Sequence, residues 1–260
     1  EAQEAGEEQE EENPFVAFEK LVEDAEHIEG FMDMYLKSDK LYLAIPKEIL
    51  GEDFLMDYRV AQGIGARGLF GGTTPSFFEM DLMAIEQHGE NVYLLQRPHR
   101  FTALEDERVA QAVELTIGSS VRESAKIEAT RPDSAVVIDA TSWFVSDMSG
   151  IGRAVGFAAS TRPGQPGSAN FDRGRSYLET VKGFEDNISV RAKLTFRSSQ
   201  PVPITSVPDG RFIPVSLHYT MARLPERPME IRYGDERVGH FWTVHKDFSQ
   251  TDSTFFRRMA

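Results

Sequence analysis

The chain contains six histidines, the side chains most often used to hold zinc, and their spacing can be compared with the needs of a metal site. They are His27, His88, His99, His218, His240 and His245. Zinc sites usually take two ligands at a short fixed spacing on one element, but His240 and His245 fall on opposite faces of a strand. The alternative is a metal site that uses one of these two with Asp235 or Asp247. We expect exposed or hydrogen-bonded histidines and no metal site in this chain.

Other patterns that could carry chemistry are incomplete. Residues 63–68 match the G-x-G-x-x-G dinucleotide pattern, which needs a helix directly after it, but the stretch through Pro75 is rich in helix-breaking glycines. We therefore predict a glycine-rich surface loop over 63–74. Neither Ser119 nor Ser149 lies in the G-x-S-x-G motif that surrounds a serine nucleophile. A glycosidase-like pair of carboxylates cannot be selected by spacing among the 42 acidic residues. No catalytic residue and no cofactor site is predicted.

Basic residues gather in one extended segment near the carboxyl end of an otherwise acidic chain. They are Arg223, Arg227, Arg232 and Arg237. Pro225 and Pro228 exclude a helix there and favour extended backbone. Guanidinium groups bind carboxylates bidentately, so these four arginines are candidates for docking onto an acidic surface of a following domain. The alternative is pairing within the segment, with Glu226, Glu230, Asp235 and Glu236.

The elements that position these residues are mostly short strands. Alternation and turn residues predict strands at 31–37, 40–45, 55–61, 76–86, 91–96, 113–127, 135–138, 188–197 and 212–219. Helices are expected from Pro14 to near Gly30, over 47–50, and after a capping box at 102–105. The clearest hairpin joins 31–37 to 40–45 across Ser38 and Asp39. In its second strand, the core-facing residues are Leu41, Leu43 and Ile45.

The pattern also predicts parts of the core. In strand 76–86, Leu82 and Ala84 share an apolar face, whereas Asp81 and Met83 share a mixed face expected to be partly wet. The apolar face also contains Phe78 and Met80, and the mixed face also contains Phe77 and Glu79. Trp143 and Phe144 follow a strand end and are expected in the core. Together these elements predict an α+β fold dominated by antiparallel hairpins, forming a single domain over 14–250.

Charge and composition limit the classes of partner and function that the chain can have. The net charge is −14, and seven glutamates fall within the first twelve residues, so we expect residues 1–13 to be a disordered acidic tail. An acidic surface repels phosphate backbones, so no nucleic-acid partner is expected. The chain has no cysteine, and no apolar run reaches the length of a membrane span.

Three stretches resemble one known family. The sequence LPERPMEIRYGDERVGHF at 224–241, continued by Asp247 and Phe248, is similar to the segment just before the catalytic domain of large bacterial zinc-dependent metalloproteases. Residues 28–55 and 139–147 resemble other parts of the same amino-terminal domain. In that family a His-Glu-x-x-His motif of the metzincin-like catalytic domain holds the zinc, and this motif is not in the sequence.

The resemblance implies a non-catalytic accessory domain of a periplasmic or extracellular bacterial protease. It implies that 251–260 begin a linker to a catalytic domain, which would be the partner and would hold the zinc. One alternative is a stand-alone extracellular module that binds a polysaccharide or protein through 63–74 or the long loop at 160–175. Another is an enzyme in its own right, which would need acids or histidines converging in one cleft.

Overall fold

The computed structural model describes most of the chain. The described residues are 14–66, 68–75, 80–103, 106–160, 165–199, 201–202, 204–230, 237, 242–249 and 256–259. The predicted acidic tail, Arg232, His240 and much of 251–260 lie outside the described residues.

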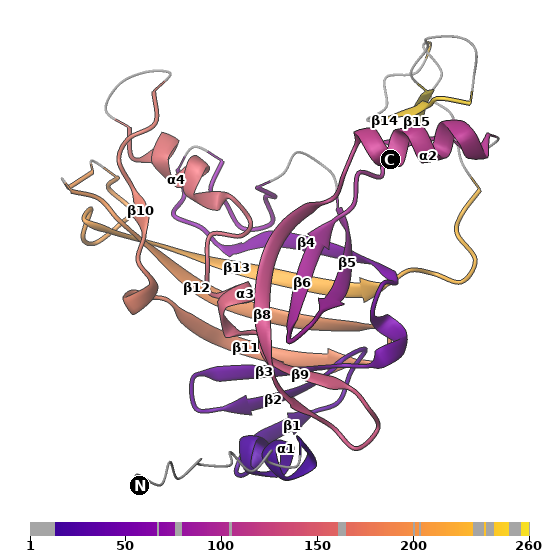
Figure 1. Ribbon diagram of the computed structural model, residues 1–260. Helices are drawn as coiled ribbons and strands as arrows, with labels where there is room; N and C mark the ends of the chain where they lie inside the picture. Colours follow the sequence, from indigo (N-terminus) through magenta and orange to yellow (C-terminus); the bar gives the residue numbers. More distant parts are fainter. Residues whose placement is uncertain are drawn as a thin grey trace, which may run out of the picture.

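Most of the strands belong to one large antiparallel sheet. In chain order they are β1 (Glu26–Ile28), β2 (Asp33–Lys37), β3 (Lys40–Ile45), β4 (Asp53–Gln62), β5 (Asp81–His88), β6 (Asn91–Gln96), β8 (Ser120–Thr130), β9 (Val136–Asp139), β10 (Asn170–Phe171), β11 (Tyr177–Phe184), β12 (Asn187–Arg197) and β13 (Phe212–Arg223). Within the described residues the order is β1-β2-β3-β9-β8-β6-β5-β4-β13-β12-β10, with β11 also paired to β12 (Figure 1).

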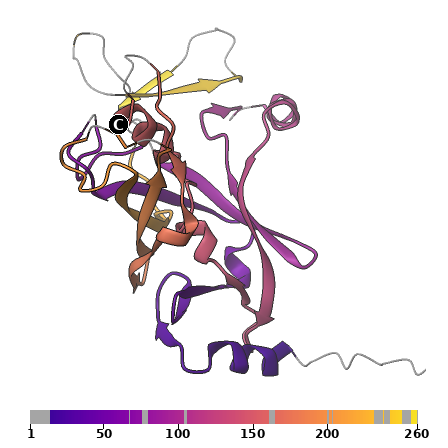
Figure 2. The same ribbon diagram turned by 90° about the vertical axis from the view of Figure 1, so that its left-hand side faces the viewer.

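The sheet curls until its two ends nearly meet, which gives it the shape of an almost closed barrel (Figures 1 and 2). The amide of Phe31 donates to the carbonyl oxygen of Phe184 at 2.8 Å and so links the β1–β2 connection to β11. Gly183 stands at this junction, where an added Cβ would lie 1.8 Å from the carbonyl oxygen of Glu29. Glycine is required there because two backbones touch.

The predicted β2–β3 hairpin is confirmed. Lys37 pairs with Lys40, and Ser38 in the turn takes a φ of 57°. The predicted core residues of β3 are fully buried, and they are Leu41, Leu43 and Ile45. Alternation also predicts β12 well, since buried and partly exposed side chains alternate from Asn187 to Leu194.

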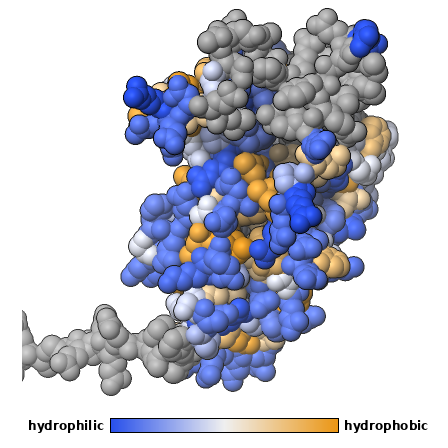
Figure 3. Space-filling model, turned by 90° about the vertical axis from the view of Figure 1, so that its right-hand side faces the viewer, coloured by the Kyte–Doolittle hydropathy of each residue, from blue (hydrophilic) through white to orange (hydrophobic). Residues whose placement is uncertain are grey.

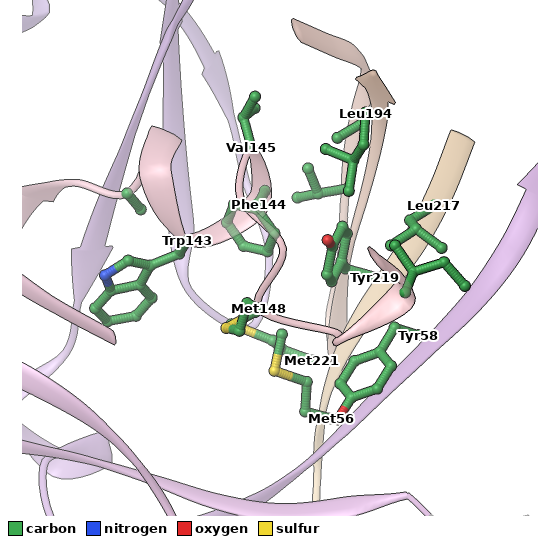
Figure 4. Close-up of a cluster of buried hydrophobic side chains, with 14 of the residues drawn as sticks. Met56, Tyr58, Trp143, Phe144, Val145, Met148, Leu194, Leu217, Tyr219 and Met221 are labelled. Atoms are coloured by element: carbon green, nitrogen blue, oxygen red, sulfur yellow. The ribbon is translucent and has the colours of Figure 1, made fainter. Parts of the chain in front are cut away.

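A short helix fills the interior of the barrel. The helix α3 (Thr141–Phe144) follows β9, and Trp143 and Phe144 are completely buried, which confirms their predicted place in the core. The ring of Phe144 meets that of Tyr219 edge-to-face, with centroids 5.6 Å apart. Figure 4 shows these rings packed with Met56, Tyr58, Val145, Met148, Leu194, Leu217 and Met221. The next helix, α4 (Ile151–Ala158), buries Ile151 and Val155 against the same core.

A second, smaller core lies outside the barrel. The helix α1 (Pro14–Val22) places Phe18 against Tyr35 of β2, with ring centroids 5.6 Å apart. Other members of this cluster are Tyr42, Ala44, Ala129, Ala135 and Val137. The strands β3 and β9 are therefore covered on both faces, as their nearly continuous apolar runs require.

A separate three-stranded sheet projects from the barrel (Figure 1). It contains β7 (Phe101–Thr102), β14 (Trp242–Asp247) and β15 (Phe256–Met259), and β7 pairs with β14 in parallel. The helix α2 (Glu107–Thr116) lies beside it. None of the described helices is long and apolar enough to cross a membrane.

The predicted dominance of antiparallel sheet is confirmed, but the fold is mostly β and the term α+β describes it only loosely. The helix expected to reach Gly30 ends at Val22, because Asp24 takes a left-handed φ of 60° and Glu26 starts β1. The short helix expected over 47–50 is present as η1 (Lys47–Ile49).

The strand expected over 113–127 was wrong at its start. The helix α2 continues to Thr116, and β8 begins only at Ser120. The side chain of Asp106 caps α2 by accepting the amide hydrogens of Arg108 and Val109, so the cap is not the expected Thr102. Short apolar stretches fit the periods of a helix and of a strand equally well, and here the Asp106 cap favours the helix.

The expectation that Asp81 and Met83 lie on a partly wet face is wrong, whereas the expected burial of Ala84 is confirmed. Among the described residues the strand begins at Asp81, and Asp81, Met83 and Ile85 are buried. Met80, expected in the core, is 46% exposed. Pairing with β4 and β6 determines which face turns inward, and this information is not contained in the strand itself.

Candidate functional site

Of the described histidines, His99 and His245 lie beside each other and the others lie apart. His27 stacks on Tyr35 with ring centroids 4.7 Å apart, and Nε2 of His218 lies 2.6 Å from Oγ of Ser189. The rings of His99 and His245 are 6.1 Å apart, whereas His88 lies beside Glu86. Among the residues that the structure describes, no three histidine or acidic side chains are grouped to hold a metal ion.

The glycine-rich loop is anchored by its apolar side chains. Residues 68–75 form turns rather than the helix that a dinucleotide site requires. Ile64 and Leu69 are buried in the main core, so the expected surface loop is partly internal. An added Cβ at Gly63 would lie 1.9 Å from the carbonyl oxygen of Leu69, which explains why a glycine stands there.

The four candidate docking arginines do not appear as one described cluster. Arg223 ends β13, and its guanidinium lies 4.8 Å from the centroid of the Phe31 ring. Arg227 is exposed in the segment that follows β13, and Arg237 is an exposed turn residue. Arg232 lies outside the described residues, so the structure places Arg223 most fully.

Arg223 lines an open groove of about 720 Å³, here called the Arg223 groove. Its lining residues are Phe31, Glu48, Ile49, Gly51, Glu52, Asp53, Phe54, Arg97, Glu114, Arg223, Leu224 and Glu226. Phe31 and Phe54 form an apolar floor, with ring centroids 6.2 Å apart. Figure 3 shows this side of the molecule, where apolar side chains gather among hydrophilic ones.

The rim of the Arg223 groove is acidic. Five carboxylate residues and two arginines line it. Arg97 is already paired with Asp53 and Glu86, at 3.1 Å in each case. The electrostatic potential at the opening of the groove is therefore dominated by three exposed glutamates, Glu48, Glu52 and Glu226. An apolar floor with an acidic rim suits a partner surface that combines an apolar group with lysine or arginine.

Sequence reasoning missed a polar network inside the barrel, here called the Asp81 network and formed by Tyr58, Asp81, Gln96 and Arg122. The carboxylate of Asp81 accepts hydrogen bonds from the Tyr58 hydroxyl and, at 2.8 Å, from Nε2 of Gln96. Nη1 of Arg122 lies 3.7 Å from the same carboxylate, and Nη2 donates to the carbonyl oxygen of Met148. The network thus ties β4, β5, β6 and β8 to the loop before α4.

Burial changes the acidity of groups in and around the Asp81 network. Burial, followed by the nearby Asp81 carboxylate, raises the pKa of Tyr58 well above its usual value. Burial also raises the pKa values of Glu123 and Asp147, although hydrogen bonds from Ser146 and from the amide of Gly152 oppose the shift. These interior acids retain protons to higher pH than exposed ones.

The Asp81 network stabilises the fold, whereas the Arg223 groove is an open surface that a partner could reach. Every polar group of the network described above is used to join strands or to fix the loop before α4. The sequence signal for the network was an aspartate alternating with Met83 and Ile85, which suggests an inward-facing acid. The Arg223 groove has no equivalent signal, because residues from five separate segments form it.

Comparison with known proteins gives two matches. The family described as "Domain of unknown function (DUF5118)" matches residues 15–63, and the family described as "Domain of unknown function (DUF5117)" matches residues 78–257. No curated protein and no solved structure matches the chain. The two matched segments contribute strands to the same large sheet, since β4 pairs with both β5 and β13. The second match covers well over half of the residues, and the chain therefore belongs to the DUF5117 family.

Proposed function

We propose that this chain is a non-catalytic accessory domain of a bacterial zinc-dependent metalloprotease, acting in the periplasm or outside the cell. In this proposal the catalytic domain follows in the same protein and supplies the zinc. The resemblance of 28–55, 139–147 and 224–241 to the amino-terminal domain of such proteases supports the assignment.

The observation that carries a docking role is the composition and place of the Arg223 groove. Its aromatic floor and acidic rim match the apolar centre and polar rim of protein interfaces. It lies where the chain leaves β13 of the large sheet and continues toward the projecting sheet (Figure 1). A domain connected to this part of the chain would meet the groove at high effective concentration.

The electrostatics favour a partner surface with lysine or arginine residues. Of the four arginines expected to dock, Arg223 is held over Phe31 as part of the wall of the groove. Arg227 and Arg237 remain candidates for additional contacts to acidic groups of the same partner.

Peptidase assays test this function. We expect the purified chain to have no peptidase activity alone and to change the activity of the separately expressed catalytic domain when the two are mixed. Zinc-dependent casein hydrolysis by the chain alone, abolished by a chelator, would overturn the non-catalytic assignment. Unchanged activity on mixing, together with no association, would overturn the docking role.

A further inference from the structure

A second concave site lies at the end of the large sheet formed by β10, β12 and the short helix η2 (Arg173–Arg175). We call it the Arg197 pocket. Its volume is about 500 Å³, and its lining residues are Asn170, Phe171, Asp172, Arg173, Arg175, Arg197 and Ser199. Three of the seven are arginines, although the whole chain carries a net charge of −14. This pocket is separate from the Arg223 groove and does not depend on the function proposed for it.

The backbone around the Arg197 pocket is fixed by Thr195, which is buried on β12. Its hydroxyl donates to the carbonyl oxygen of Arg175 at 2.8 Å, and its amide donates to Oγ of Ser176 at 2.9 Å. Its carbonyl oxygen accepts the amide hydrogen of Asp172, also at 2.8 Å. These bonds hold η2 against β12, so the arginines of η2 are presented at fixed positions beside Arg197.

The charges of the Arg197 pocket are only partly compensated. Arg175 pairs with Asp172 at 2.8 Å and lies over the ring of Phe212, 4.6 Å from its centroid. In the part of the chain that the structure describes, neither Arg173 nor Arg197 forms an ion pair. Two exposed guanidinium groups are therefore directed to a pocket with a single carboxylate.

A neighbouring arginine extends the positive surface without adding a free group. The guanidinium of Arg211 also lies near Phe212, 5.7 Å from the ring centroid, and pairs with Asp209 at 2.7 Å. This pairing lowers the pKa of Asp209 to about 2, so the pair stays ionised at neutral pH. The ring of Phe212, which does not line the pocket, thus has two guanidinium neighbours.

We propose that the Arg197 pocket binds an acidic peptide segment, with Arg173 and Arg197 each receiving a glutamate or aspartate carboxylate. Guanidinium groups bind carboxylates through paired hydrogen bonds, and two fixed guanidiniums select two carboxylates on one short segment. A nucleic acid is disfavoured, because its long phosphate backbone would extend over the acidic remainder of the surface. An acidic polysaccharide would offer the same carboxylate chemistry, and competition separates it from the peptide.

Fluorescence anisotropy with a labelled hexaglutamate peptide tests the proposal. The variants Arg197→Ala and Arg173→Ala should each weaken binding by about tenfold, which is the effect of losing one charge-assisted hydrogen-bonding group. The matched control is Arg108→Ala, which removes one exposed positive charge from α2 and should leave the dissociation constant unchanged. Unfolding midpoints equal to that of the wild type will establish that the three variants fold.

Competition experiments distinguish the ligand classes. The proposal is supported when unlabelled hexaglutamate displaces the probe and inorganic phosphate at equal charge does so much less effectively. Displacement by oligogalacturonate but not by hexaglutamate would reassign the pocket to acidic sugars and overturn the peptide proposal. Equal weakening in Arg108→Ala, or no binding of hexaglutamate to the wild type at low ionic strength, would also overturn it.

Discussion

Replacing Asp81 by alanine tests whether the Asp81 network holds the curved sheet together. The substitution removes the acceptor for the Tyr58 hydroxyl and for Nε2 of Gln96, and it removes the carboxylate 3.7 Å from Arg122. Breaking a fully buried ionic pair from one side costs about 3–5 kcal/mol. Because the side chains of Asp81 and Arg122 keep 11% and 24% of their exposure, water can recover part of the loss. We expect the free energy of unfolding to fall by about 3 kcal/mol.

The pair formed by Asp53 and Arg97 provides a matched control on the adjacent strand. Oδ1 of Asp53 lies 3.1 Å from Nε of Arg97, and the two side chains are 37% and 28% exposed. A half-exposed ion pair contributes about 0.2–1 kcal/mol, so Asp53→Ala should destabilise the protein far less than Asp81→Ala. Both variants remove one aspartate that pairs with an arginine, so their difference measures the burial of Asp81 together with its hydrogen bonds from Tyr58 and Gln96.

Urea unfolding followed by circular dichroism gives both free energies on the same scale. The reasoning would be refuted if Asp81→Ala cost less than about 1 kcal/mol, or no more than Asp53→Ala. A double variant carrying Asp81→Ala and Tyr58→Phe should be less destabilised than the sum of the single variants, since the unpaired Tyr58 hydroxyl is removed. Additive effects would show that the Tyr58 hydrogen bond contributes nothing.

Two further predictions concern the barrel junction and the buried acids. Gly183→Ala should lower the free energy of unfolding by about 2 kcal/mol or more, because the new Cβ meets the carbonyl oxygen of Glu29. Gly118→Ala places its Cβ in open space and should not destabilise the protein. Equal effects of the two substitutions in urea unfolding would contradict this prediction. Burial raises the pKa of Asp147 in the folded protein above its ordinary value of 3.8. Folding therefore favours the protonated carboxyl, and the contribution of Asp147 to the free energy of unfolding is lost as the pH rises through the folded-state pKa. Asp147→Asn keeps an acceptor for the amide of Gly152 and should therefore gain stability relative to wild type as the pH rises above about 4. A difference that is constant with pH would refute the shift.

Local patterns predicted the elements that depend only on neighbouring residues. The β2–β3 hairpin has a two-residue turn and a second strand whose core-facing residues alternate along the sequence. The alternation and the turn length both indicate a hairpin. Trp143 and Phe144 were placed in the core because large aromatic residues after a strand end are rarely left exposed. Such features need no knowledge of distant parts of the chain.

Long-range contacts explain what the sequence could not predict. The junction of Gly30 with Gly183 joins residues from opposite halves of the chain, and a glycine in a strand does not identify its neighbour. Asp81 was assigned to a wet face because its strand alone has two plausible faces, and the pairing of β5 with β4 and β6 decides between them. The Arg223 groove combines residues from five segments, so only the folded chain reveals its acidic rim.

Calorimetric titration of the chain into the separately expressed catalytic domain tests the proposed docking function most directly. The account predicts saturable association, and a double variant of Glu52→Lys and Glu226→Lys should bind about tenfold more weakly because two rim charges are reversed. Glu128→Lys, which changes an exposed acid outside the Arg223 groove, should bind like the wild type. No heat of association with the wild type, or equal affinity of the double variant, would contradict docking through this groove.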